Sequence, residues 1–155
     1  MAAGDLASPL PRLGNLRPAA YLEAENLAHR FGQAEADPDS SGGQVWAARR
    51  GQTEAGHIVF GPYAYLDEGG YLALFRLRRT GQGSGLLATL DTCVAGGNPQ
   101  TGLVEVRVED LPEGQWRWVP IRFDHPGGNY EVRVLWSAAA SLAVDAIALW
   151  RVEAP

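Results

Sequence analysis

Residues 130–136 read YEVRVLW, and their alternation decides what kind of fold this chain adopts. Apolar residues occupy every second position, with Glu131 and Arg133 between them, which is the period of a half-buried β-strand. Residues 103–108 (LVEVRV) repeat the same period of two. Residues 71–79 (YLALFRLRR) begin apolar at successive positions and end with arginines that share one face. The pattern predicts strands.

Similar short runs fill most of the chain, at 44–48, 57–60, 86–94, 117–123 and 142–152. Glycine-rich turns separate the runs, as at 41–43, 69–70, 81–85, 96–99 and 126–128. Several short strands between such turns indicate an all-β antiparallel sandwich or barrel. Pro120 lacks an amide N–H, so we expect its strand at a sheet edge. The one helical candidate is a turn or two near 24–32. Residues 1–17 are expected to form a flexible tail or linker, and 18–155 the domain.

Composition limits the functional classes. The 155 residues suit one domain, and the formal net charge of −5 argues against a nucleic-acid partner. All 13 basic residues are arginine. No apolar run reaches the roughly 18 residues that span a bilayer, so no membrane partner is expected. We see no signal peptide at the N-terminus. Cys93 is the single cysteine, which excludes an intrachain disulfide.

Three carboxylates call for an explanation. If residues 20–27 (AYLEAENL) form a strand, Glu23 and Glu25 lie on one face and repel each other unless a cation sits between them. Asp145 stands in the most apolar run, where an unpaired carboxylate costs several kcal/mol. Oxygen ligands without a nearby lysine suit a hard cation, Ca²⁺ above all. The alternative is that the two glutamates are solvated and that Asp145 pairs with Arg30 or Arg151.

The order of several motifs resembles the carbohydrate-binding modules of families 6 and 35. The motifs are YLEAEN (21–26), ADPDSSGGQV (36–45), GPYAYLDEGGYLALFRLR (61–78), EGQWRW (113–118) and LAVDAIAL (142–149). This resemblance covers about residues 19–152. It implies a jelly-roll β-sandwich of galactose-binding-like topology and a structural Ca²⁺ that joins the first and last strands. Glu23, Glu25 and Asp145 would supply the side-chain ligands, with a backbone carbonyl near Gln44. An extracellular location also follows from the resemblance alone.

The resemblance also implies a carbohydrate partner and places the sugar site at Trp116. Aromatic faces stack on sugar C–H surfaces while polar groups fix the orientation. Tyr63 or Tyr65 is expected to form the opposite wall, although both also suit plain loop packing. A polar residue is common two positions before the closing aspartate in such modules, but here that position is Ala143, with Ser141 the nearest polar substitute. Sugar binding is therefore either retained, moved to another surface or lost.

No motif of a hydrolase, nucleotide-binding loop or metalloprotease appears, and the three histidines are scattered. We therefore expect no enzyme activity. The first hypothesis is a non-catalytic, calcium-stabilised carbohydrate-binding module that serves as an accessory domain, with a tethered enzyme as its partner. The second is a structural or protein-interaction sandwich that has lost sugar binding, which an exposed apolar patch away from the loops would favour.

Overall fold

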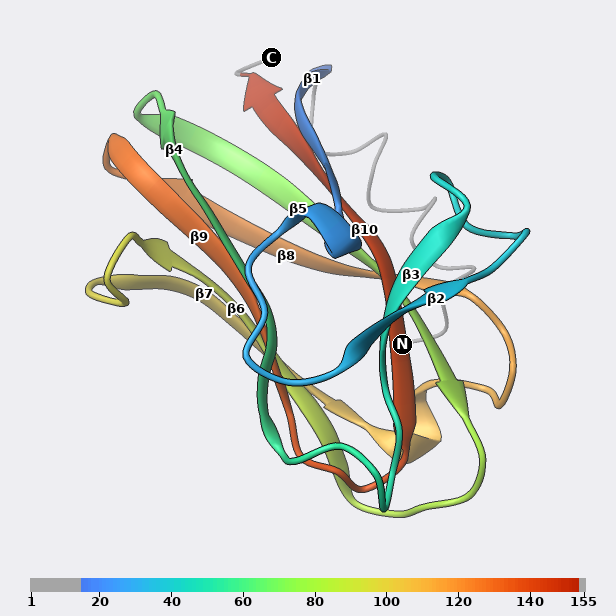
Figure 1. Ribbon diagram of the computed structural model, residues 1–155. Helices are drawn as coiled ribbons and strands as arrows, with labels where there is room; N and C mark the ends of the chain where they lie inside the picture. The colour runs from blue at the N-terminus through green and yellow to red at the C-terminus, as the bar shows by residue number, and fades with distance from the viewer. Residues whose placement is uncertain (1–14, 154–155) are drawn as a thin grey trace.

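The computed structural model describes residues 15–153, which form two antiparallel β-sheets packed face to face (Figure 1). The strands are β1 (Asn15–Glu23), β2 (Gln33–Ala36), β3 (Gln44–Ala48), β4 (Gly56–Leu66), β5 (Gly69–Thr80), β6 (Leu86–Val94), β7 (Gln100–Arg107), β8 (Arg117–His125), β9 (Gly128–Trp136) and β10 (Ser141–Glu153). Two short 3₁₀ turns, η3 (Ala24–Asn26) and η4 (Val108–Asp110), complete the described part of the chain. The antiparallel all-β fold predicted from the alternation is confirmed, and it is the sandwich that the resemblance implied.

One sheet has six strands and the other four. The six-stranded sheet runs β2-β3-β10-β5-β8, with β1 as its sixth strand paired to β10, and the four-stranded sheet runs β4-β9-β6-β7. Strand β10 organises the larger sheet because two strands share one of its edges. Residues 142–144 pair with β3, whereas residues 146–153 pair with β1. Strand β8 lies at the edge of its sheet, as Pro120 predicted.

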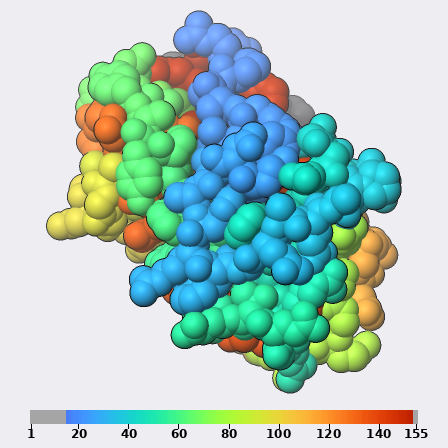
Figure 2. All heavy atoms as spheres, in the orientation of Figure 1, coloured from blue at the N-terminus to red at the C-terminus, as the bar shows by residue number. Residues whose placement is uncertain are grey.

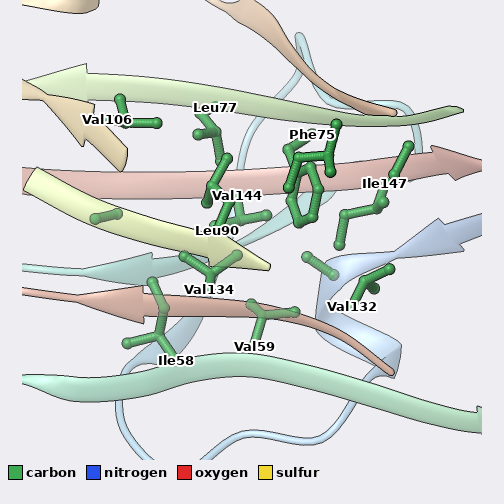
Figure 3. Close-up of a cluster of buried hydrophobic side chains, with 14 of the residues drawn as sticks. Ile58, Val59, Phe75, Leu77, Leu90, Val106, Val132, Val134, Val144 and Ile147 are labelled. Carbon is green, nitrogen blue, oxygen red and sulfur yellow. The ribbon is translucent and has the colours of Figure 1, made fainter. Parts of the chain in front are cut away.

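The core lies between the two sheets, where the alternate residues of each strand point inward (Figure 3). Phe75 and Leu77 of β5 and Val144 of β10 meet Val132 and Val134 of β9 across this interface. All five are 0% exposed. Burying one such side chain contributes roughly 1.5–3 kcal/mol, so this layer is the main stabilising feature of the fold.

A second apolar cluster covers the outer face of the six-stranded sheet. Its buried members are Leu72 and Leu74 of β5 and Ala148 of β10, and its half-buried members are Leu16, Trp118, Trp150 and Val152. Strands β5 and β10 are apolar on both faces for this reason. Trp150 belongs to this outer cluster, because its position in β10 alternates with the inward-facing Leu149.

The segment between β1 and β2 connects the sheets. Ala28 of this segment and Phe60 of β4 exchange backbone hydrogen bonds of 2.8 and 2.9 Å. The segment lies on the face of the molecule that Figure 2 shows. Trp46 fixes the segment through an indole hydrogen bond to the Phe31 carbonyl and a stacking contact with His29, whose ring centroid is 3.5 Å away. This arrangement positions the η3 turn.

One expected boundary requires correction, and one strand was not expected. Residues 15–17, expected in the tail, form the start of β1, because their backbone pairs with residues 151–153 of β10. Residues 1–14, the rest of the expected tail, lie outside the described residues. Strand β2 was not expected, because its sequence QAEA carries no run of strand-forming residues. Within residues 15–153, no helix is long and apolar enough to cross a membrane.

Candidate carbohydrate and cation site

The three carboxylates singled out in the sequence approach one another around a turn. Glu23 ends β1, and Glu25 follows in η3. We expected the two glutamates to lie on one face if residues 20–27 formed a strand. The strand ends at Glu23, so they do not. Asp145 lies in β10 where its pairing with β5 is irregular, between Val144 and Ile147. The turn between β2 and β3 brings Ser41 and Gly42 against them.

Two carboxylates lie close to Gly42, and a larger residue at this position would displace them. A Cβ atom at this position would stand 3.0 Å from Glu23 Oε2 and 3.2 Å from Glu25 Oε2. The Ser41 hydroxyl donates to Glu23 Oε1 at 2.7 Å, and the Ser41 amide donates to Asp145 Oδ1 at 3.1 Å. Ser41 thus ties Glu23 to Asp145. The Ser-Ser-Gly-Gly motif is the part of the sequence that allows this close approach.

Asp145 is 0% exposed and is paired inside the protein. Arg76 Nη1 of β5 donates to Asp145 Oδ2 at 2.6 Å and to the Asp39 carbonyl at 2.9 Å. The partner is neither Arg30 nor Arg151, the two arginines considered from the sequence. The sequence carried a signal for Arg76, because this arginine is the first charged residue after the apolar part of β5. Its distance of 69 positions from Asp145 hid the pairing.

The charge around the turn is not balanced. Glu23, Glu25 and Asp145 carry three formal negative charges against the one positive charge of Arg76. Burial raises the pKa of Glu25 above its usual value, and the charges of Glu23 and Asp145 raise it further, against one backbone hydrogen bond that lowers it. Glu25 Oε1 is buried without a hydrogen-bond partner. A positive charge placed here would relieve both features.

These residues fit a hard divalent cation by chemistry. Carboxylate and hydroxyl oxygens at one turn are the ligand type that Ca²⁺ selects. In the arrangement of residues 15–153, however, no three His, Cys, Asp or Glu side chains already form a metal-holding group. Occupation by a cation would therefore require side-chain movements.

Trp116, which immediately precedes β8, lies across two arginines of β5. The Arg76 Cζ atom is 4.7 Å from the centre of the indole, and the Arg78 Cζ atom is 4.5 Å from it. Arg78 Nη2 also binds Asp37 Oδ2 at 2.6 Å. The ring is half-buried, and its Nε1 has no hydrogen-bond partner. Trp116 is thus an aromatic group supported from the sheet and partly open to solvent.

The two tyrosines predicted to bind sugar do not join Trp116. Tyr63 and Tyr65 lie on β4, which faces β3, whereas Trp116 leads into β8, which faces β7. These are opposite edges of the sandwich, so neither tyrosine forms a wall opposite Trp116. Ser141 begins β10, where its hydroxyl accepts the Arg50 amide at 3.0 Å. Topology separates the two tyrosines from Trp116 because β4 and β8 belong to different sheets, whereas Ser141 of β10 belongs to the same sheet as β8.

Tyr63 and Tyr65 are nevertheless conspicuous on their own strand, with exposures of 46% and 68%. Tyr63 adopts a left-handed backbone conformation with φ of 60°, which is unusual for a residue other than glycine. Burial raises the pKa of its hydroxyl, and a hydrogen bond to the buried Glu131 raises it further. The backbone strain at Tyr63 is a second, separate feature of the four-stranded sheet.

No family model matches the chain, and no curated protein matches it. Solved structures do. A family 6 carbohydrate-binding module from Cellvibrio mixtus lichenase 5A, in complex with cellotriose, is 19% identical with a TM-score of 0.62, over 88% of this chain and 100% of that one.

Two further structures extend the comparison. A family 35 module from Clostridium thermocellum is 20% identical with a TM-score of 0.58, over 84% of this chain and 97% of that one. An exo-β-1,3-galactanase from Phanerochaete chrysosporium is 16% identical with a TM-score of 0.60, and the match covers 86% of this chain but 29% of that longer chain. The chain therefore has the fold of the family 6 and family 35 carbohydrate-binding modules, as its motifs indicated.

Proposed function

We propose that this chain is a non-catalytic carbohydrate-binding module in which Trp116 stacks on a sugar ring. The observation that supports the proposal is the half-buried Trp116 indole supported by Arg76 and Arg78 on β5. A preorganised aromatic ring loses little conformational freedom on binding, so stacking against sugar C–H groups yields net affinity. The match to one part of a longer galactanase chain supports an accessory role beside a tethered enzyme.

Glycan binding tests this proposal directly. Affinity electrophoresis through soluble β-glucans, followed by calorimetry with cello-oligosaccharides, should detect binding by the wild-type chain. Trp116→Ala should abolish it and lower the melting temperature only slightly. Tyr21→Ala is a matched control, because Tyr21 is 52% exposed on β1 and stacks on no arginine within residues 15–153. Retention of full affinity by Trp116→Ala would exclude this ring, and loss of binding in Tyr63→Ala would move the site to β4.

We also propose that Ca²⁺ binds at Glu23, Glu25 and Asp145. The buried, unpartnered Glu25 Oε1 and the excess of negative charge support this. The cation would neutralise the glutamates and join the end of β1 to β10 and the Ser41 turn. Its role would be structural, because it would bring three chain segments together.

Thermal unfolding after chelation, with and without excess Ca²⁺, tests the cation proposal. A ligand at 100 times its dissociation constant adds about 2.7 kcal/mol to the stability of the folded state, which raises the melting temperature by several degrees for a domain of this size. Glu25→Gln should reduce this rise while retaining the shape of the side chain. An equal rise with Mg²⁺, or no rise at all, would contradict a calcium site.

The second candidate function is protein interaction, which the outer apolar cluster of the six-stranded sheet favours. Trp118, Trp150 and Val152 are half-buried around Leu72 and Leu74, on a face that sandwiches commonly leave polar. Failure to bind any glycan, together with self-association that Trp150→Arg abolishes, would support this function over carbohydrate binding.

A further inference from the structure

Two buried aspartates bind the two arginines that contact the Trp116 ring. Asp37 is 6% exposed and Asp145 is 0% exposed. Each binds one arginine at 2.6 Å, Asp37 through Arg78 and Asp145 through Arg76. The two arginines are two residues apart on β5, so they project from the same face about 7 Å apart. The indole extends over both guanidinium groups.

This arrangement determines the orientation of the ring in a way that a single contact would not. One guanidinium against an indole allows the ring to rotate about the contact, whereas two at a fixed separation restrict that rotation. Both Cζ atoms lie within the roughly 6 Å over which a cation and an aromatic ring attract each other. A planar guanidinium also stacks on an aromatic face, as a lysine ammonium cannot.

The aspartates in turn are held by the turn between β2 and β3. Asp37 Oδ1 accepts the Asp39 amide at 2.9 Å, and the Asp37 carbonyl accepts the Ser40 hydroxyl at 2.7 Å. Burial tends to raise the pKa of Asp37, but the Asp39 amide and the Arg78 guanidinium together outweigh it and hold the pKa below its usual value. Asp37 therefore remains charged under ordinary conditions and keeps Arg78 in place.

We propose that Asp37 and Asp145 are positioning residues for Trp116, acting through Arg78 and Arg76. The inference rests on the proposed function only for the role of the ring in sugar binding. The positioning of the ring by these two ion pairs does not depend on that role. It predicts that neutralising a buried carboxylate that never meets the ligand changes the Trp116 environment and weakens glycan binding.

The experiment uses the five tryptophan indole N–H signals in a two-dimensional ¹H–¹⁵N spectrum of the full chain, with the Trp116 signal assigned from its loss in Trp116→Phe. Asp37→Asn should shift and broaden this signal and leave the signals of Trp46 and Trp136 in place. Cello-oligosaccharide affinity should fall about 3- to 30-fold, the range expected when a cation–aromatic contact is lost. Arg78→Lys, which keeps the charge but not the plane, should act in the same direction.

Asp91→Asn is the matched control. Asp91 is 5% exposed and binds Arg133 of β9 on the other sheet, in a pair that stacks on no tryptophan. This variant should lose stability as Asp37→Asn does, yet leave both the Trp116 signal and the affinity unchanged. An unchanged Trp116 signal in both Asp37→Asn and Arg78→Lys would overturn the proposal. If the wild-type chain binds no glycan, the proposed function fails, and the indole signals still decide whether the ring is held by these pairs.

Discussion

A single buried carboxylate connects most of the features of the candidate site. Asp145 receives hydrogen bonds from Arg76 and from the Ser41 amide, and it has no exposed surface. Removing one partner of a buried ion pair is costly because the other charge remains poorly solvated. Asp145 therefore contributes to stability through protein groups even without a cation.

We predict that Asp145→Asn lowers the free energy of unfolding by about 3 kcal/mol, the usual effect of breaking a buried ion pair. Urea denaturation in the presence of a chelator measures this. Asp124→Asn is the control, since the Asp124 side chain is 87% exposed beside Arg122 and its pair should contribute less than about 1 kcal/mol. A loss for Asp145→Asn that disappears in chelator would assign its role to the cation and not to Arg76.

At the scale of elements, the edge strands β7 and β8 pack closely because β7 contains a glycine. A Cβ atom at Gly102 would stand 2.5 Å from Ile121 Cγ2 of β8 and 2.8 Å from Thr92 Oγ1 of β6. No side chain fits that space without moving its neighbours. The loop that carries Trp116 joins β7 to β8, so this approach also affects the site.

Gly102→Ala should destabilise the domain by about 1–3 kcal/mol, the usual effect of overpacking, and Gly102→Val by more. Thermal unfolding of the two variants gives the comparison. If Gly102→Ala is as stable as the wild type, β7 and β8 must be able to separate freely, and the packing described here is not required.

At the scale of the whole molecule, the single thiol is buried inside the sandwich. Cys93 of β6 is 0% exposed, and burial raises its pKa to about 11. The thiolate is the reactive form, so at ordinary pH the group is both inaccessible and protonated. Its reactivity therefore reports the opening of the four-stranded sheet.

We predict that Ellman's reagent does not label the folded chain at pH 8 and labels it completely in denaturant. Under native conditions the slow rate should follow the unfolding equilibrium, so that Asp145→Asn labels faster in proportion to its loss of stability. Rapid labelling of the wild-type chain would contradict the burial of Cys93.

Local alternation was enough to predict most of the strands, although not β2. The period of two in 103–108 and 130–136 and the glycine-rich turns between runs indicated an antiparallel sandwich or barrel, and strands such as β3 and β6 begin and end where the runs do. Edge placement of β8 followed from the missing N–H of Pro120. Backbone hydrogen bonding and side-chain alternation are properties of short segments, which is why sequence alone determined them.

Only the tertiary structure decided which side chains meet. The ion pair of Asp145 and Arg76 depends on the register of β10 against β5, and the separation of Tyr63 from Trp116 depends on which sheet each strand enters. Trp150 likewise faces outward because of its parity in β10. The residues involved lie tens of positions apart along the chain. No local pattern specifies which of them meet, because the packing of whole sheets determines the pairing.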